Sequence, residues 1–310
     1  MTRAAGVRRL SGLLAAVALA AAASEASAAD GGRLLIGSCV DPPFIDAHGE
    51  LFTALPSGRA PRRIRKLPPF GVFGCTDSNP MWSPDGGRIA YNRADDIAVG
   101  PAAPRRRSRL DRIVARDGFW PSWSPDSSRL AFLRRGEDGL FRVAVVGAGG
   151  GRARDLIGPG PFELPSWTRS GRHVLYSTNV PGDPSTPRMW RIGASGGRPH
   201  SLGRGRFARM SPDGRKIAFV LGDDVWTMNP DGSGRRRLVN HPDGTMTWQL
   251  AWSPDGRRIA YVFYPEVEQP FTELRMVGRN GRGRRVVDLP RRLQTSRWVD
   301  WGGDATRGAP

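Results

Sequence analysis

The sequence predicts an all-β fold: a six-bladed β-propeller closed by pairing of a C-terminal strand with N-terminal strands. A short motif recurs five times between residues 82 and 261, and its starts lie 41, 44, 43 and 42 residues apart. In addition, the two ends of the chain hold complementary parts of a sixth unit. A period of this length is typical of a radial array of four-stranded sheets. The frequent Gly and Pro residues, 40 and 27 in number, argue against a helical solenoid.

Each copy of the motif contains an aromatic residue or Met, a turn, a basic residue and an apolar triplet. The copies occupy residues 82–91, 123–132, 167–176, 210–219 and 252–261. In the turn, Pro fixes its own φ, Asp bonds the local backbone and Gly accepts a positive φ, so a hairpin is expected. The triplet is β-prone and apolar enough for a strand that is buried on both faces. These segments are the two inner strands of each predicted blade.

The remaining strands of each unit are expected further along the chain. Third strands are predicted at residues 140–145, 187–192, 224–229 and 273–277, and fourth strands at 235–239 and 284–287. Residues 33–36, 50–54 and 62–65 resemble a second, third and fourth strand without a first, whereas residues 297–302 resemble a first strand without the others. Together they make the sixth blade and remove an exposed sheet edge. The alternative is an open or differently numbered ring.

The motif resembles the Trp-Ser-Pro-Asp-Gly repeat of the TolB-like β-propellers, a WD40-like repeat class, over residues 31 to 303. Two units depart from it: Met210 replaces the Trp, and Arg169-Ser170 replaces Pro-Asp. TolB itself carries an α/β domain before its propeller, but the resemblance here covers the propeller only, so no such domain is expected. The expected organisation is a signal peptide at residues 1–29, the propeller at 30–303 and a disordered tail at 304–310.

The N-terminal segment predicts export. Arg3, Arg8 and Arg9 precede an Ala/Leu/Val-rich stretch at residues 13–23 and the small-residue sequence Ala26-Ser27-Ala28, which is typical of a secretory signal peptide. No segment reaches the length of a transmembrane helix. Alternatives are the twin-arginine route, through Arg8-Arg9, and lipidation at Cys39. A periplasmic or extracellular location is expected.

Cys39 and Cys75 are the only cysteines. In an exported chain this pair favours a disulfide, and the alternative is two buried free thiols. The formal charge is +18, and removal of residues 1–28, with three Arg and one Glu, leaves +16. Such a basic protein attracts polyanions. No basic segment has the interleaved aromatics of a nucleic-acid platform, so no specific nucleic-acid partner is expected.

Most chemically suggestive residues have structural explanations. The repeated Asp85, Asp126, Asp213 and Asp255 each serve a turn, and the repeated Trp82, Trp123, Trp167 and Trp252 pack between blades. The segment 193–197 matches the Gly-x-Ser-x-Gly motif of hydrolases, but it falls between the third and fourth strands of a blade. The four histidines are scattered over different blades, so no catalytic set, metal site or cofactor is predicted.

The connections from a fourth strand to the next blade's first strand vary most, and in a propeller they gather around one mouth of the channel. Trp120, His241, Trp248 and Arg297 lie there and are the candidate binding residues. The alternative is that Trp120 and Trp248 pack under their own loops.

The predicted function is a monomeric, noncatalytic exported module that binds a protein or an anionic envelope polymer. The alternative is a propeller enzyme of the lyase or lactonase type, with carboxylates and histidines meeting in the channel.

Overall fold

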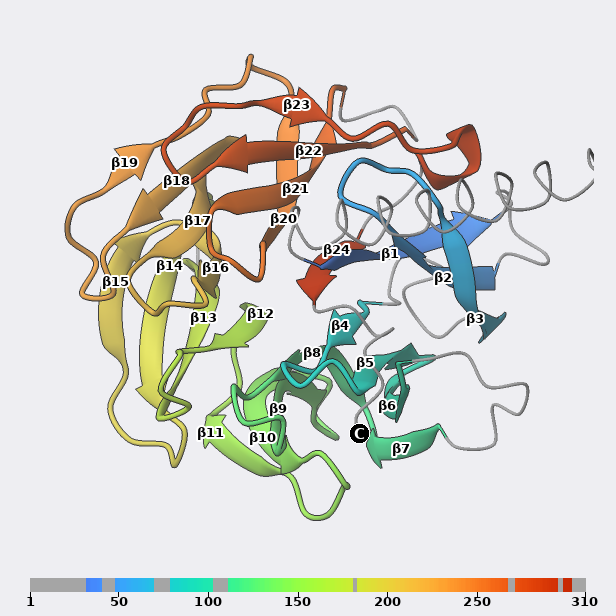
Figure 1. The fold of residues 1–310 in the computed structure, drawn as a ribbon. Helices are drawn as coiled ribbons and strands as arrows, with labels where there is room; N and C mark the ends of the chain where they lie inside the picture. The colour runs from blue at the N-terminus through green and yellow to red at the C-terminus, as the bar shows by residue number, and fades with distance from the viewer. Residues whose placement is uncertain are drawn as a thin grey trace, which may run out of the picture.

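The computed structural model describes residues 32–40, 48–69, 79–102, 111–180, 183–266, 271–294 and 298–302. These residues form six four-stranded antiparallel sheets arranged in a ring (Figure 1). The prediction of an all-β, six-bladed propeller is therefore confirmed. None of the helical segments in this part of the chain is long and apolar enough to cross a membrane.

The strands of blades 2 to 6 run outward from the channel in chain order, and in blade 1 the last strand of the chain takes the innermost place. Blade 1 combines β24 (Trp298–Gly302) with β1 (Arg33–Val40), β2 (His48–Ala54) and β3 (Arg62–Pro69). Blade 2 contains β4 (Met81–Trp82), β5 (Arg88–Arg93), β6 (Asp96–Pro101) and β7 (Arg112–Ala115). Blade 3 contains β8 (Gly118–Trp123), β9 (Arg129–Arg135), β10 (Phe141–Gly147) and β11 (Arg154–Ile157).

The other three blades repeat this order. Blade 4 contains β12 (Phe162–Trp167), β13 (His173–Val180), β14 (Asp183–Gly193) and β15 (His200–Arg204). Blade 5 contains β16 (Arg206–Met210), β17 (Ile217–Leu221), β18 (Asp224–Met228) and β19 (Arg236–Arg237). Blade 6 contains β20 (Met246–Trp252), β21 (Arg258–Tyr264), β22 (Glu273–Gly278) and β23 (Arg285–Val286), and a short 3-10 helix, η3 (Arg291–Leu293), precedes β24.

The ring is closed by the pairing that the sequence predicts. β24 lies antiparallel to β1, with Gly302 opposite Arg33, and Figure 1 shows these two strands side by side near the centre of the ring. In blade 6 the equivalent position is occupied by Ser253, whose amide donates to the carbonyl of Arg258 across the motif turn. Blade 1 is therefore a complete blade in which a break in the chain replaces the motif turn.

The hydrophobic core is divided among the spaces between neighbouring blades. One cluster joins Leu35 and Leu51 of blade 1 to Trp82 and Ile89 of blade 2, and similar clusters follow around the ring. This arrangement requires strands that are buried on both faces, as the apolar triplets predict. In β17, for example, four consecutive residues are buried.

Two fourth strands are shorter than predicted. β19 and β23 have two residues each, where 235–239 and 284–287 were expected to be strands. All four residues of these strands are exposed, and three are arginines. Long charged side chains on the outermost strand limit further pairing, which is a common way to blunt a sheet edge.

Several predictions fall outside the described residues. They are the signal peptide at 1–29, the tail at 304–310 and the Cys39–Cys75 disulfide, because residues 1–31, 303–310 and Cys75 are not described and only the backbone of Cys39 is. All three stay predictions.

Candidate functional site

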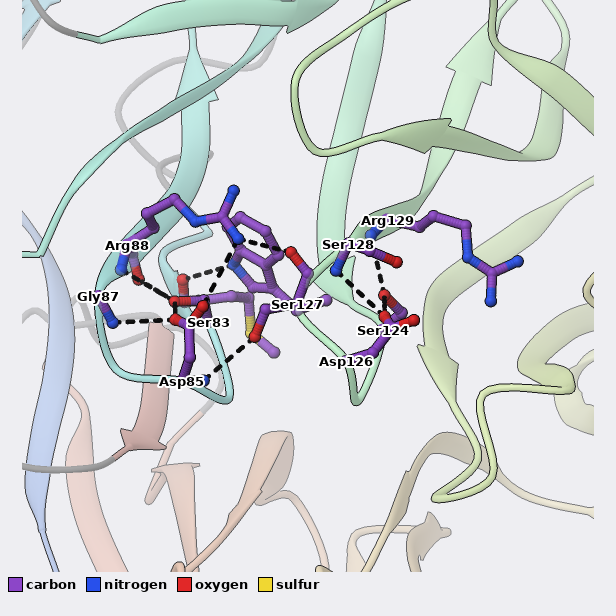
Figure 2. Close-up of polar contacts among 11 residues, drawn as sticks. Ser83, Asp85, Gly87, Arg88, Ser124, Asp126, Ser127, Ser128 and Arg129 are labelled. Atoms are coloured by element: carbon purple, nitrogen blue, oxygen red, sulfur yellow. Dashed lines mark hydrogen bonds and ion pairs between the residues drawn. The ribbon is translucent and has the colours of Figure 1, made fainter. Parts of the chain in front are cut away.

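The motif turns are held by their own serine and aspartate side chains. In blade 2 the Ser83 hydroxyl donates to Asp85 at 2.5 Å, and Asp85 also accepts from the amide of Gly87 at 3.0 Å. Figure 2 shows the same arrangement in blade 3, where Asp126 accepts from Ser124 and from the amide of Ser128. Asp213 and Asp255 make the equivalent contacts. The turn role of these four aspartates is confirmed.

The basic residue of the motif connects its blade to the next one. The guanidinium of Arg88 donates to the carbonyl of Ser127 at 2.6 Å and lies 4.7 Å from the ring centroid of Trp123. The amide of Asp85 donates to the Ser127 hydroxyl across the same boundary (Figure 2). These contacts join two neighbouring motif turns directly.

The motif tryptophans are also inter-blade contacts. The indole of Trp123 donates to the carbonyl of Met81 at 3.1 Å, and that of Trp167 donates to Ser122 at 3.0 Å. Arg129 lies 4.7 Å from the ring centroid of Trp167, as Arg88 does from that of Trp123. The packing role that the sequence indicates for these residues is therefore confirmed. Their indole N–H groups form hydrogen bonds between blades and so stabilise the ring.

A cavity of about 470 Å³ opens in the centre of the ring. Residues of all six blades line it, namely the ends of the first strands and the motif turns that follow them. We call this end of the channel the turn-side mouth, and the opposite end, where the fourth strands connect to the next blade, the loop-side mouth. Pro84, Pro125, Pro212 and Pro254 stand around the turn-side mouth, and blade 4 places the exposed Arg169 there instead.

Arg209 and Asp300 both line this cavity and are its buried charged residues. Arg209 is only 9% exposed, and burial lowers its pKa to about 10, although the charge of Asp300 opposes this effect. Burial likewise raises the pKa of Asp300, which accepts a 2.7 Å hydrogen bond from the amide of Trp82. The side chain of Asp300 keeps some accessible surface, and since this residue lines the cavity, we place that surface in the channel.

Apolar side chains pack together near the loop-side ends of several first strands. Trp120 and Trp248 both pack against the cluster that contains Leu164, Phe207 and Trp298. The ring of Trp248 lies 4.9 Å from that of Phe207 and 6.4 Å from that of Trp298. The structure thus brings two of the predicted binding residues together as packed tryptophans, and a contact of either with a partner stays a prediction.

Of the other two predicted binding residues, His241 contacts the same cluster through Phe263. His241 is 9% exposed, stacks on Phe263 with ring centroids 4.4 Å apart, and its Nδ1 lies 3.0 Å from the carbonyl of Asp223. Burial lowers its pKa. Arg297 lies outside the described residues. Binding through either residue stays a prediction.

Sequence reasoning did not find the charged residues of the cavity. A sequence signal for them exists at the position immediately before the motif aromatic or Met. This position varies among the six units, with Ser in two of them, and it holds a charged residue only at Arg209 and Asp300. Among the described residues, no group of three His, Cys, Asp or Glu side chains is placed to hold a metal ion. The Gly-x-Ser-x-Gly segment begins at the end of β14 and precedes β15, as expected for a turn within a blade.

The ring, its closing strand and its central cavity define a closed six-bladed β-propeller. No protein-family model matches the chain. In sequence, the chain aligns with the Tol-Pal system protein TolB of Anaeromyxobacter dehalogenans strain 2CP-C over 126 residues at 32% identity. The alignment covers 37% of this chain and 28% of that protein. The chain is thus TolB-like in sequence over that segment, and the match spans less than a third of its curated relative.

Two solved structures extend the comparison in fold. TolB from Acinetobacter baumannii superposes with a TM-score of 0.67 at 18% identity, over 88% of this chain and 67% of TolB. An oligogalacturonate lyase from Vibrio parahaemolyticus gives a TM-score of 0.53 at 11% identity, over 84% of this chain and 82% of the lyase. At these identities both comparisons show the fold alone. The likeness to TolB is thus found in sequence over one segment and in fold over most of the chain.

Proposed function

We propose that this protein is an exported, noncatalytic propeller that binds a protein or an anionic envelope polymer at the turn-side mouth of its channel. The observation that carries the proposal is the basic turn of blade 4 beside the cavity. Arg169 and Arg172 are exposed there, and Ser170 stands where the complete motif turns have an aspartate. The similarity to a protein named for the Tol-Pal system supports an envelope role.

Rigid packing between the blades supports a binding role because it presents the mouth without further ordering. The motif residues are engaged in their own turns or in the next blade, so a partner meets a preformed surface. Preorganisation of this kind reduces the entropy that association loses. An enzyme of the lyase or lactonase type needs several converging acid and base groups. The described lining of the cavity supplies one carboxylate, Asp300, and no histidine.

The proposal is tested by cross-linking the mature protein to an envelope fraction of the source cell and mapping the cross-links by mass spectrometry. The variant Arg169→Glu/Arg172→Glu reverses the charge at the turn-side mouth. The matched control, Arg152→Glu/Arg282→Glu, makes the same charge change on exposed residues of two outer turns of the same face. We expect the first variant to lose the cross-links and the control to keep them.

Equal losses in both variants, together with release at moderate salt, would indicate nonspecific attraction to arginine and refute the proposal. Arg297→Glu, at the sequence position just before β24, tests the predicted binding role of Arg297 in the same assay. Loss of cross-links in this variant alone would move the binding surface to the surroundings of Arg297. N-terminal sequencing of the protein from the cell tests export, since cleavage near residue 29 is expected.

A further inference from the structure

The cavity contains an incompletely paired cation. The side chain of Arg209 comes from the first strand of blade 5, and its Nη1 donates to the carbonyl of Pro165 in blade 4 at 3.3 Å. Within the described part of the chain, this is its one hydrogen bond, and no carboxylate lies within 4.0 Å of it. A guanidinium has five N–H donors, and burying it without partners is unfavourable. Arg209 therefore has donors available for an anionic group in the cavity.

An acceptor lies two blades away. Asp300 belongs to blade 1, and its Oδ2 is engaged by the amide of Trp82. Blade 6, which lies between blades 5 and 1, contributes Ala251 at the equivalent position of its first strand. The methyl group of Ala251 leaves this sector of the lining without a long side chain. A ligand in the cavity can thus meet both a hydrogen-bond donor and an acceptor.

We propose that the channel binds a small hydroxy- or amino-carboxylate, whose carboxylate pairs with Arg209 while its hydroxyl or ammonium group donates to Asp300. A planar guanidinium matches a carboxylate in a two-bonded geometry. The cavity volume of about 470 Å³ falls within the usual range of small-molecule sites. With Arg169 at the mouth, the charged residues of the described lining are two arginines and Asp300, which give a net charge of +1. This charge favours entry of an anion.

The second charge selects among anions. A simple or multiply charged anion on Arg209 gains nothing from Asp300 and is repelled by its carboxylate. A carboxylate that carries its own donor satisfies both residues. The site therefore discriminates by the donor group, and this distinguishes it from general attraction of anions to a basic protein.

The test uses isothermal titration of the isolated mature protein with lactate, glycine and galacturonate, and with acetate as the probe that lacks a donor. We expect at least one of the first three to bind with a Kd below about 10 mM and at least tenfold more tightly than acetate. Arg209→Met is expected to weaken that binding at least tenfold. Asp300→Asn is expected to reduce the preference over acetate. Arg257→Met, at a side chain that is 83% exposed, is the matched control.

The proposal is overturned if none of the three probes binds, if acetate binds equally well, or if Arg209→Met leaves the affinity unchanged. Circular dichroism and urea unfolding establish that each variant is folded. If Arg209→Met does not fold, Arg209→Lys keeps the charge without the planar fork, and unchanged affinity in that variant overturns the two-bonded pairing. The assay contains no envelope partner, so its failure is separate from failure of the proposed function.

Discussion

Asp126 provides a residue-scale prediction of pH dependence. Hydrogen bonds from the hydroxyl of Ser124 and from Ser128 lower its pKa from 3.8 to about 2. Because the folded protein binds this proton less tightly than the unfolded chain, the stabilisation is complete above about pH 4 and is lost as the pH falls toward 2. We expect the stability difference between wild type and Asp126→Ala to shrink over this interval, as measured by urea unfolding. Glu137→Ala, at an exposed carboxylate outside the motif turns, is the control, and an equal pH response there would contradict the assignment.

Arg88 carries a second residue-scale prediction, about the contact between blades 2 and 3. Replacement by Met removes the hydrogen bond to Ser127 and the cation–π contact with Trp123. We expect Arg88→Met to lower the free energy of unfolding by about 1–2 kcal/mol, since the site is partly exposed. Arg88→Lys keeps the charge and should lose less. The control is Arg257→Met, and a similar loss there would show that net charge, not the blade contact, is responsible.

The roles of these residues were predictable because the motif repeats. A residue type that recurs at one position of every unit must serve the unit or its contact with the next, and the aspartates and tryptophans do so. The charges of the cavity were not predicted. Whether Arg209 points into the channel depends on the local register of β16, which shifts between Arg206 and Arg209.

At the scale of the element, the first strand of several blades contains a shift of pairing register that the sequence does not predict. The pairing of β8 with β9 shifts between Phe119 and Ser122, and Trp120 there has a φ of 57°. β12 and β16 shift in the same place, with positive φ at Leu164 and Phe207. A bulge of this kind re-aims a side chain. This is the physical reason why the packed aromatic cluster could not be located from strand alternation.

The closing strand β24 provides the prediction at this scale. Trp298, Val299 and Trp301 are each 5% exposed or less, and burial of such side chains stabilises by roughly 1.5–3 kcal/mol each. We expect a chain that ends before Trp298 to lose most of its cooperative thermal unfolding and to become sensitive to protease, because blade 1 then exposes a sheet edge. A chain that ends after Gly302 keeps the strand and is the control. Unchanged unfolding of the shorter chain would contradict the role of β24 in closure.

At the scale of the whole molecule, the number of blades and their closure followed from counting strands at the two ends of the chain. The predicted pairing of the two cysteines needs a chemical test instead. We expect the exported protein to contain a Cys39–Cys75 disulfide, so that no thiol can be titrated after denaturation. The variant Cys39→Ser/Cys75→Ser should lose about 3–4 kcal/mol in the free energy of unfolding. Two titratable thiols in protein isolated without reductant would contradict it.

The break in blade 1 makes the ring a candidate for circular permutation. Gly302 and Arg33 are paired as Ser253 and Arg258 are in blade 6, where four residues, Pro254–Arg257, complete the turn. We therefore join Gly302 to Arg33 through Pro-Asp-Gly-Arg and open the chain between Gly149 and Gly150, in the outer turn of blade 3 between β10 and β11. The permuted ring should keep its β-sheet circular dichroism and unfold cooperatively. Since about 1 kcal/mol corresponds to a few degrees for a protein of this size, its Tm should stay within about 10 °C of the wild type.

A control with a Gly-Gly linker, too short to span the same turn, should be less stable. Equal stability of the two permutants would mean that the register of β24 against β1 differs from that of the other blades.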